Sequence, residues 1–303
     1  MRLFCRIRFQ GLKRRWSIRI GILSFVDRLL DEGVAPEEVV PFVRSSQKGK
    51  PFAARGMEPR AATYDDPAGF ARALAGIDKL VLISPPSLDN AVRLEQLHGA
   101  VRAAHGAGLA QLAFVGLSDP EQRAFALEDV DLAIEHSIRA VGIPFTFLRN
   151  SVYLDELGPE LAVAASSGEL LSATGDRTLN WAPRADQAAA IAAAVMQDGH
   201  LGATYDLVSP EPYTYADIAA WLTEASGREV AHREAPAAEV ISALVAGGME
   251  GEHARSMVED FHGAIAEGKC RTTGRDIERL SGRPGRPTPA YLARLLERAR
   301  SDV

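Results

Sequence analysis

Short apolar runs that favour strands alternate with segments of helical periodicity over the first half of the chain. We expect strands at Val39–Val43, Lys79–Ser84, Leu112–Val115 and Phe145–Leu148. Helical stripes lie between most of these runs, and the longest one ends at Gly108. Strands that alternate with helices form parallel sheets covered by helices. The sequence therefore predicts an α/β fold with a doubly wound parallel sheet.

The segment around residue 150 is the first candidate for a site. A helical stripe ends at Gly142, and Pro144 prevents its continuation. A short strand-like run then leads into Asn150–Tyr153. Ligands of open parallel sheets bind beyond the carboxyl ends of the strands. We expect this loop to lie where a cofactor and a substrate meet, with an ordinary surface turn after a buried strand as the simpler alternative.

The alternation loosens after residue 153. A turn of hairpin type is expected at Gly175-Asp176, an Ala-rich helix after Pro183 and one more strand at Thr204–Val208. The remainder is mostly helical. We predict one domain from residues 1–153, completed by about 183–209, and a smaller, mostly helical substrate lobe from residues 154–182 and 210–303.

Composition and charge exclude several classes of partner. The 303 residues are 47% hydrophobic and carry a net charge of -6, which argues against nucleic-acid contact. Apolar runs stay well below the ~20 residues of a membrane span, so no membrane contact is expected. Cys5 and Cys270 stand alone, which fits a reducing, cytoplasmic compartment. The seven histidines show no metal-binding spacing, and no metal site is expected.

Several polar or small residues follow the predicted strands. Arg44 ends the second strand, where a guanidinium can pair with an adenosine 2'-phosphate, although a solvated loop arginine is an equal alternative. Ser84-Pro85 and Gly116 end two later strands and would allow close approach of a flat ring or a phosphate. Asp131 and Glu135 lie one helical turn apart beside the same edge, and two exposed carboxylates are the simpler expectation.

Four stretches of the chain resemble the NmrA-like atypical short-chain dehydrogenases. They are Gly76–Ser84, Leu132–Arg139, Ile143–Asn150 with Tyr153, and Tyr205–Ser209. Within that family the similarity is greatest to the bacterial NAD(P)H:quinone oxidoreductase and triphenylmethane-dye reductase group. The resemblance implies a Rossmann-like NAD(P)-binding domain, NADPH rather than NADH as cofactor, and hydride transfer to a small-molecule acceptor that is quinone-like or a conjugated cation.

The resemblance also implies positions for the site. Arg44 would favour the 2'-phosphate, and Thr63 and Tyr64 would lie beside the adenine, with Thr63 in place of the aspartate of the family. Asp131, a candidate for proton transfer, replaces a Lys or His of many relatives. The other implied contacts with the cofactor or the acceptor are Ser84, Pro85, Gly116, Asn150, Ser151, Val152 and Tyr153, the last as a flat contact for the acceptor.

The chain departs from the family at its amino end. The glycines of the phosphate-binding turn fall on Ser17, Ile20 and Leu23, and only Gly21 remains nearby as a cofactor contact. The first 28 residues form a basic arm. It is interpreted as a strand-turn-helix with altered turn chemistry, as a transit peptide, or as the product of a misassigned gene start.

Two other functions are alternatives to a reductase. There is no Tyr-x-x-x-Lys pair, and hydride transfer followed by protonation from water does not require one. The alternatives are a non-catalytic NAD(P)-sensing regulatory protein and an inactive relative with a degraded glycine-rich loop. A monomer or a homodimer is expected.

Overall fold

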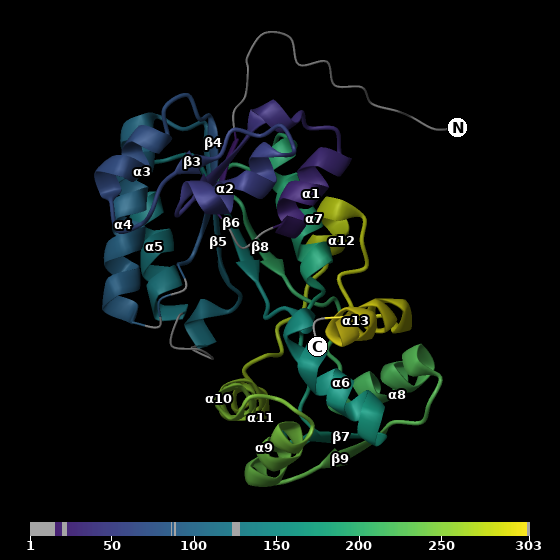
Figure 1. The fold of residues 1–303 in the computed structure, drawn as a ribbon. Helices are drawn as coiled ribbons and strands as arrows, with labels where there is room; N and C mark the ends of the chain where they lie inside the picture. Colours follow the sequence, from purple (N-terminus) through teal and green to yellow (C-terminus); the bar gives the residue numbers. More distant parts are fainter. Residues whose placement is uncertain (1–15, 20–22, 86, 88, 123–127, 302–303) are drawn as a thin grey trace.

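A computed structural model describes residues 16–19, 23–85, 87, 89–122 and 128–301 of the chain. These residues form a seven-stranded parallel sheet and a smaller lobe below it (Figure 1). The sheet order is β3-β2-β1-β4-β5-β6-β8. The strands are β1 (Trp16–Arg19), β2 (Val39–Val43), β3 (Arg60–Ala61), β4 (Lys79–Ile83), β5 (Gln111–Leu117), β6 (Phe145–Asn150) and β8 (Thr204–Leu207).

Helices cover both faces of this sheet. One face carries α1 (Leu23–Asp31), α7 (Arg184–Met196) and α12 (Asp276–Ser281), and the other carries α3 (Pro67–Ala73), α4 (Asn90–Ala107) and α5 (Glu128–Val141) (Figure 1). The alanines of α7 are small enough for that helix to pack closely against the strands. A strand order that reverses between β1 and β4 defines the doubly wound fold, so the predicted fold class is confirmed.

The segment between β2 and β4 was not predicted in full. It contains α2 (Ser46–Ala53), the two-residue strand β3, and α3. Gly49 and Pro51 lie inside α2 and weaken its helical pattern, while Ser45 caps its first turn. A strand of two residues leaves no periodicity to detect. Weak local signal therefore explains why α2 and β3 were not predicted. Helix α3 does carry a start signal, Asp66 as its cap followed by Pro67, and this signal was overlooked.

The amino-terminal segment enters the centre of the sheet. Strand β1 pairs in parallel with both β2 and β4, and α1 follows it. The strand-turn-helix interpretation is thus confirmed for residues 16–19 and 23–31. Gly21, predicted as a cofactor contact, lies outside the described residues.

The smaller lobe is mostly helical. It contains η3 (Leu154–Leu157), α6 (Gly158–Ser167), α8 (Tyr215–Ser226), α9 (Ala237–Ala246), α10 (Gly251–Ser256), the π-helical segment η4 (Met257–His262), α11 (Gly263–Ala266) and α13 (Pro289–Ser301). Its core includes the fully buried side chains of Trp181 and Tyr215. Helix α12 lies instead against α7 and β8, on the sheet.

The expected hairpin at Gly175-Asp176 is wrong. Strand β7 (Glu169–Ser172) pairs with β9 (Ala231–Glu234), far along the chain, and the two run in parallel. Gly175 and Asp176 do bend the chain, with φ of 61° and 55°. The local turn signal was real, but pairing between distant segments decided what the turn connects.

None of the helices in the described part of the chain combines the length and apolar character that a membrane span requires.

Candidate active site

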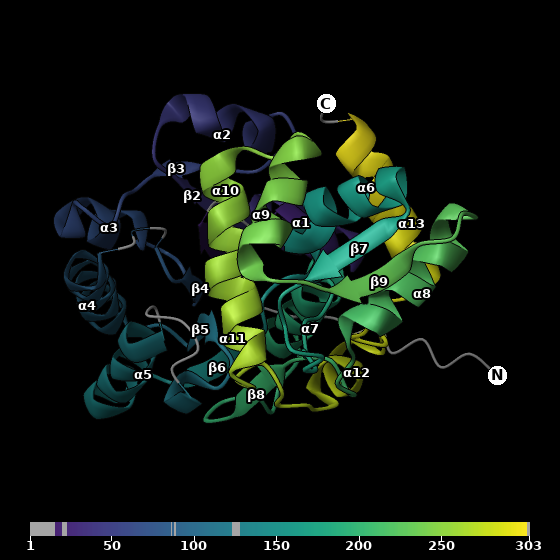
Figure 2. The ribbon, with the colours of Figure 1, turned by 90° about the horizontal axis from the view of Figure 1, so that it is seen from below.

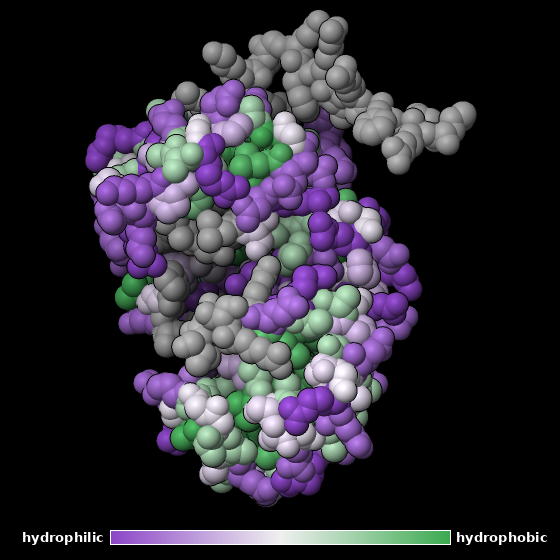
Figure 3. Space-filling view, turned by 45° about the vertical axis from the view of Figure 1, so that its right-hand side comes forward, coloured by the Kyte–Doolittle hydropathy of each residue, from purple (hydrophilic) through white to green (hydrophobic). Residues whose placement is uncertain are grey.

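A cleft of about 750 Å³ lies at the carboxyl ends of β4, β5 and β6. Its other wall is the helical run α10, η4 and α11, which runs in front of the sheet in Figure 2, where the molecule is seen from below. The space-filling view shows the sheet domain above the smaller lobe, with patches of hydrophobic side chains on both bodies (Figure 3). The predicted residues that line the cleft are Ser84, Pro85, Gly116, Asp131, Asn150, Ser151, Val152 and Tyr153.

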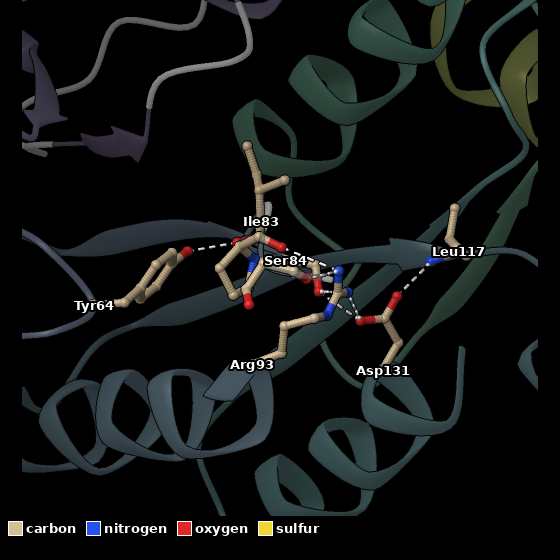
Figure 4. A network of polar contacts seen from close by, with 8 residues as sticks. Tyr64, Ile83, Ser84, Arg93, Leu117 and Asp131 are labelled. Carbon is tan, nitrogen blue, oxygen red and sulfur yellow. Dashed lines mark hydrogen bonds and ion pairs between the residues drawn. The ribbon is translucent and has the colours of Figure 1, made fainter. Parts of the chain in front are cut away.

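A buried ionic network forms the floor of this cleft (Figure 4). The Ser84 hydroxyl donates to Asp131 Oδ1 over 2.7 Å and accepts from Arg93 Nη2 over 2.6 Å. Arg93 and Asp131 also lie 3.6 Å apart as an ion pair, with side chains 3% and 2% exposed. The network joins the end of β4 to helices α4 and α5.

Arg93 was missed by the sequence analysis. Its Nη1 donates to the carbonyl oxygens of Pro85 and Ser87, at 3.1 and 3.3 Å. One guanidinium therefore holds the chain after β4, where the resemblance places the cofactor. A single arginine near the start of a helix gives no signal for this role, because the loop carbonyls that it binds are defined only by the fold.

Asp131 is engaged through both carboxylate oxygens. Oδ2 accepts from the backbone N–H of Leu117 over 3.0 Å. A Cβ at Gly116 would lie 3.1 Å from this oxygen, so glycine leaves room for the carboxylate. Burial raises the pKa of Asp131, while the hydrogen bonds from Ser84 and Leu117 and the charge of Arg93 oppose that rise. The alternative of two exposed carboxylates is wrong, because Glu135 is also only 2% exposed.

The loop after β6 divides its side chains between the cleft and the protein interior. Asn150 Nδ2 donates to the Tyr153 hydroxyl over 3.2 Å, and Asn150 Oδ1 is buried with no hydrogen bond from any described residue. Ser151 Oγ accepts from the Ala182 N–H and from Gln187 Nε2, so it anchors the loop to α7. The guanidinium carbon of Arg184 lies 4.7 Å from the centre of the Tyr153 ring.

The predicted adenosine contacts lie apart from this cleft, after β2 and β3. Arg44 is exposed, and no ion-pair partner for it exists among the residues that the structure describes. Thr63 is partly exposed. Tyr64 is 3% exposed, stacks on Phe70 and donates to the Ile83 carbonyl over 2.5 Å (Figure 4). Its hydroxyl thus supports the end of β4.

Comparison with known proteins identifies the family of this chain. No family model matches the chain. Quinone oxidoreductase 2 of Escherichia coli strain K12 is 30% identical over 86% of this chain and 90% of its own. That relationship decides the family. The chain belongs to the NmrA-like family of atypical short-chain dehydrogenases, a family of NAD(P)H-dependent oxidoreductases.

Two solved structures extend the comparison of this NmrA-like protein. Triphenylmethane reductase of Citrobacter sp., complexed with NADP(H), has a TM-score of 0.85 and 30% identity over 94% of this chain and 99% of its own. An NADPH-dependent quinone oxidoreductase of Escherichia coli, complexed with NADPH, has a TM-score of 0.80 and 28% identity over 94% and 99%. The resemblance inferred from the sequence is thereby confirmed.

A second set of charged residues lies beyond the cleft, at the ends of β6 and β8. Arg149 donates to both oxygens of Glu135 over 2.8 Å each. Asp206 lies opposite Arg149 in the register of the two parallel strands and is half-buried. Its Oδ1 receives no hydrogen bond from the described residues. Burial raises the pKa of Asp206 to about 6, which the charge of Arg149 opposes.

Replacement of Asp206 by asparagine is expected to stabilise the NmrA-like protein above pH 6. Because the folded pKa is raised, ionisation costs stability once the pH exceeds the pKa of the unfolded chain, and the full cost is present above about pH 6. Solvent screening reduces this cost to about 1–2 kcal/mol. Urea unfolding at pH 7.5 should show the gain, and unfolding at pH 4 should show almost none. An equal gain at both values would contradict the assignment.

Three possible metal ligands come together in the smaller lobe, which their spacing in the sequence did not indicate. One donor atom from each of Asp176, His232 and Glu234 lies within 4.8 Å of the others. The Ser172 hydroxyl donates to Glu234 and is hydrogen-bonded to His232. His232 and Glu234 are therefore also part of a hydrogen-bonded cluster that joins β7 to β9.

Proposed function

We propose that this NmrA-like protein transfers hydride from NADPH to a quinone-like or conjugated cationic acceptor. The observation that carries the proposal is the cleft itself. It joins the ends of three adjacent strands to the π-helical wall of the smaller lobe, at the edge where parallel sheets bind dinucleotides. Family membership and the two relatives solved with NADP(H) or NADPH support it.

The described residues fit the cofactor at two points. Arg44 follows β2 without a described ion-pair partner and is free to meet a 2'-phosphate. Asn150 lines the cleft and its Oδ1 has no described donor, so this amide would be available to the N–H of a nicotinamide carboxamide. The nicotinamide supplies the hydride when it is bound. The protein supplies the loop held by Arg93, on which the ring would lie.

Orientation is the main contribution of the protein in this proposal. Both oxygens of Asp131 already accept hydrogen bonds, and the Tyr153 hydroxyl accepts from Asn150. We assign proton transfer to neither group, although the Tyr153 hydroxyl keeps its own proton to donate. A cationic acceptor needs only hydride, and a reduced quinone can take its proton from water. Holding donor and acceptor in contact is enough to explain a large rate enhancement.

Charge on the wall of the smaller lobe favours a cationic acceptor over an anionic one. Four acidic residues, but only one basic residue, reach the cleft from this lobe; they are Glu156, Glu259, Asp260 and Glu267, against Lys269. Most of this charge is compensated, since Glu267 pairs with Lys269 over 2.6 Å, Glu156 with Arg184 over 2.6 Å and Glu259 with Arg255 over 3.8 Å. Asp260 carries the remaining negative charge. A net negative field concentrates cations at the entrance.

Calorimetry with NADPH, followed by NADPH oxidation with and without an acceptor, tests the proposal. We expect binding, slow oxidation alone, and faster oxidation with menadione or a triphenylmethane dye. Binding without turnover would favour the regulatory sensor. Absence of binding would favour the inactive relative, for which Ser17, Ile20 and Leu23 at the glycine positions are the specific observation.

Substitution of Arg44 by alanine should weaken NADPH selectively. A lost charge-assisted contact costs about 1–3 kcal/mol, or about 5- to 150-fold in Kd. NADH lacks the 2'-phosphate, so its Kd should change less than twofold. The exposed Arg72 on α3 supplies the matched control, because Arg72→Ala removes the same charge from another exposed site. Equal losses for both cofactors would contradict the assigned contact.

A further inference from the structure

The wall of the cleft opposite the sheet is a π-helical segment. Segment η4 (Met257–His262) interrupts the helical run between α10 and α11. Glu259, Asp260 and Phe261 of this segment line the cleft. Such π-helical turns are rare in proteins and are frequent at functional sites. Here the segment places an aromatic ring in a wall that is otherwise mostly polar.

Phe261 is backed by the core of the smaller lobe. Its ring packs edge to face against Trp181, with centroids 5.3 Å apart and planes at 80°. Trp181 itself is fully buried. One side of the Phe261 ring therefore rests on a rigid partner. Phe261 also lines the cleft, together with Val152 and Tyr153 from the loop after β6. A planar acceptor in this cleft can meet aromatic surface from both lobes.

The next residue, His262, is fully buried and anchors the segment. Its Nδ1 accepts from the Ala173 N–H over 3.1 Å, so a neutral ring carries its proton on Nε2. Nε2 lies 2.8 Å from the Tyr215 hydroxyl and 3.3 Å from Glu160 Oε1. The Tyr215 hydroxyl also reaches Glu160 Oε2 over 3.4 Å. The contacts tie η4 to α6, to α8 and to the chain after β7.

We propose that His262 is a positioning residue for acceptor recognition and acts through Phe261. The inference rests on the proposed function. A side chain that is hydrogen-bonded to α8 and to the chain after β7, and that lies beside Glu160 of α6, fixes the rotation of η4. The ring that precedes it in the chain is thereby presented to the cleft. No part of this anchor lines the cleft, so its effect on the acceptor must pass through the wall.

A double-mutant cycle tests the inference. The variants are Phe261→Ala, His262→Asn and the double variant, with His253→Asn as the matched control on an exposed position of α10. The Kd of menadione is measured by calorimetry without cofactor, and the Kd of NADPH separately. Each single variant should weaken menadione about tenfold, a loss of aromatic contact and buried area, and leave NADPH within twofold. The double variant should be no weaker than the worse single variant.

Each outcome decides between the possibilities. Three results would overturn the inference. The losses in menadione binding could multiply to about a hundredfold in the double variant, His262→Asn could leave menadione binding unchanged, or NADPH binding could weaken as much as menadione binding. If His262→Asn does not fold, Tyr215→Phe replaces it in the test, because it removes only one hydroxyl. This variant should weaken menadione binding about two- to threefold, the loss of one weak contact. The effect should disappear when Phe261 is also replaced by alanine. Menadione binding without NADPH oxidation would overturn the proposed function alone.

Discussion

Replacing Arg93 by methionine is expected to lower the free energy of unfolding by about 3–5 kcal/mol. The change leaves the Asp131 carboxylate buried without its cation, and it removes the donors to Ser84, Pro85 and Ser87. The cost of an uncompensated buried charge exceeds the cost of the lost contacts. Urea unfolding at pH 7.5 measures it.

The control for this prediction is the double variant Arg93→Met with Asp131→Leu. Replacement of a whole buried ion pair by apolar side chains is close to neutral, whereas removal of one partner is costly. The double variant should therefore recover most of the stability lost in Arg93→Met. It should still bind NADPH more weakly than the wild type, because the loop after β4 has lost its anchor. A double variant as unstable as Arg93→Met would contradict the account.

Tyr153→Ala should lower both stability and acceptor turnover. The ring packs against Arg184 and its hydroxyl is bonded to Asn150, so truncation should cost about 1–2 kcal/mol, less than for a core residue because the ring is only partly buried. The same ring lines the cleft, and its loss should reduce kcat/KM for menadione by about tenfold, since an aromatic contact adds to simple burial. Thermal unfolding and steady-state kinetics measure the two effects.

Tyr153→Phe separates these two roles. It keeps the ring and removes one hydrogen bond, which costs about 1 kcal/mol. Acceptor KM should then stay near the wild-type value. A wild-type stability in Tyr153→Ala would contradict the packing contact with Arg184, and a wild-type kcat/KM would contradict the placement of the acceptor beside β6.

Agreement between sequence and structure is best where the signal is local. Strand β2 was predicted at its observed bounds, and α7 begins directly after Pro183 as predicted, because apolar period and helix-start residues act over a few residues. Helix α2 and strand β3 were missed because one contains Gly49 and Pro51 and the other has two residues. The hairpin at Gly175-Asp176 failed because a turn does not specify which strands pair.

The candidate site shows the same division. Its position followed from the sequence, because the polar loop after a strand-like run must lie at the carboxyl edge of a parallel sheet. The roles of Arg93, Phe261 and His262 did not follow, because each depends on partners from other elements.

The sequence by itself determined the α/β alternation, the strand ends and the family. The first two follow from short-range hydrophobic patterns, and the family follows from stretches that resemble those of its members. Only the tertiary structure decided which charges are buried. Asp131 and Glu135 read as surface residues of an amphipathic helix, yet each meets an arginine from a different element. Burial of a charge is stable only with such a partner, and partners distant in the chain are chosen by the fold.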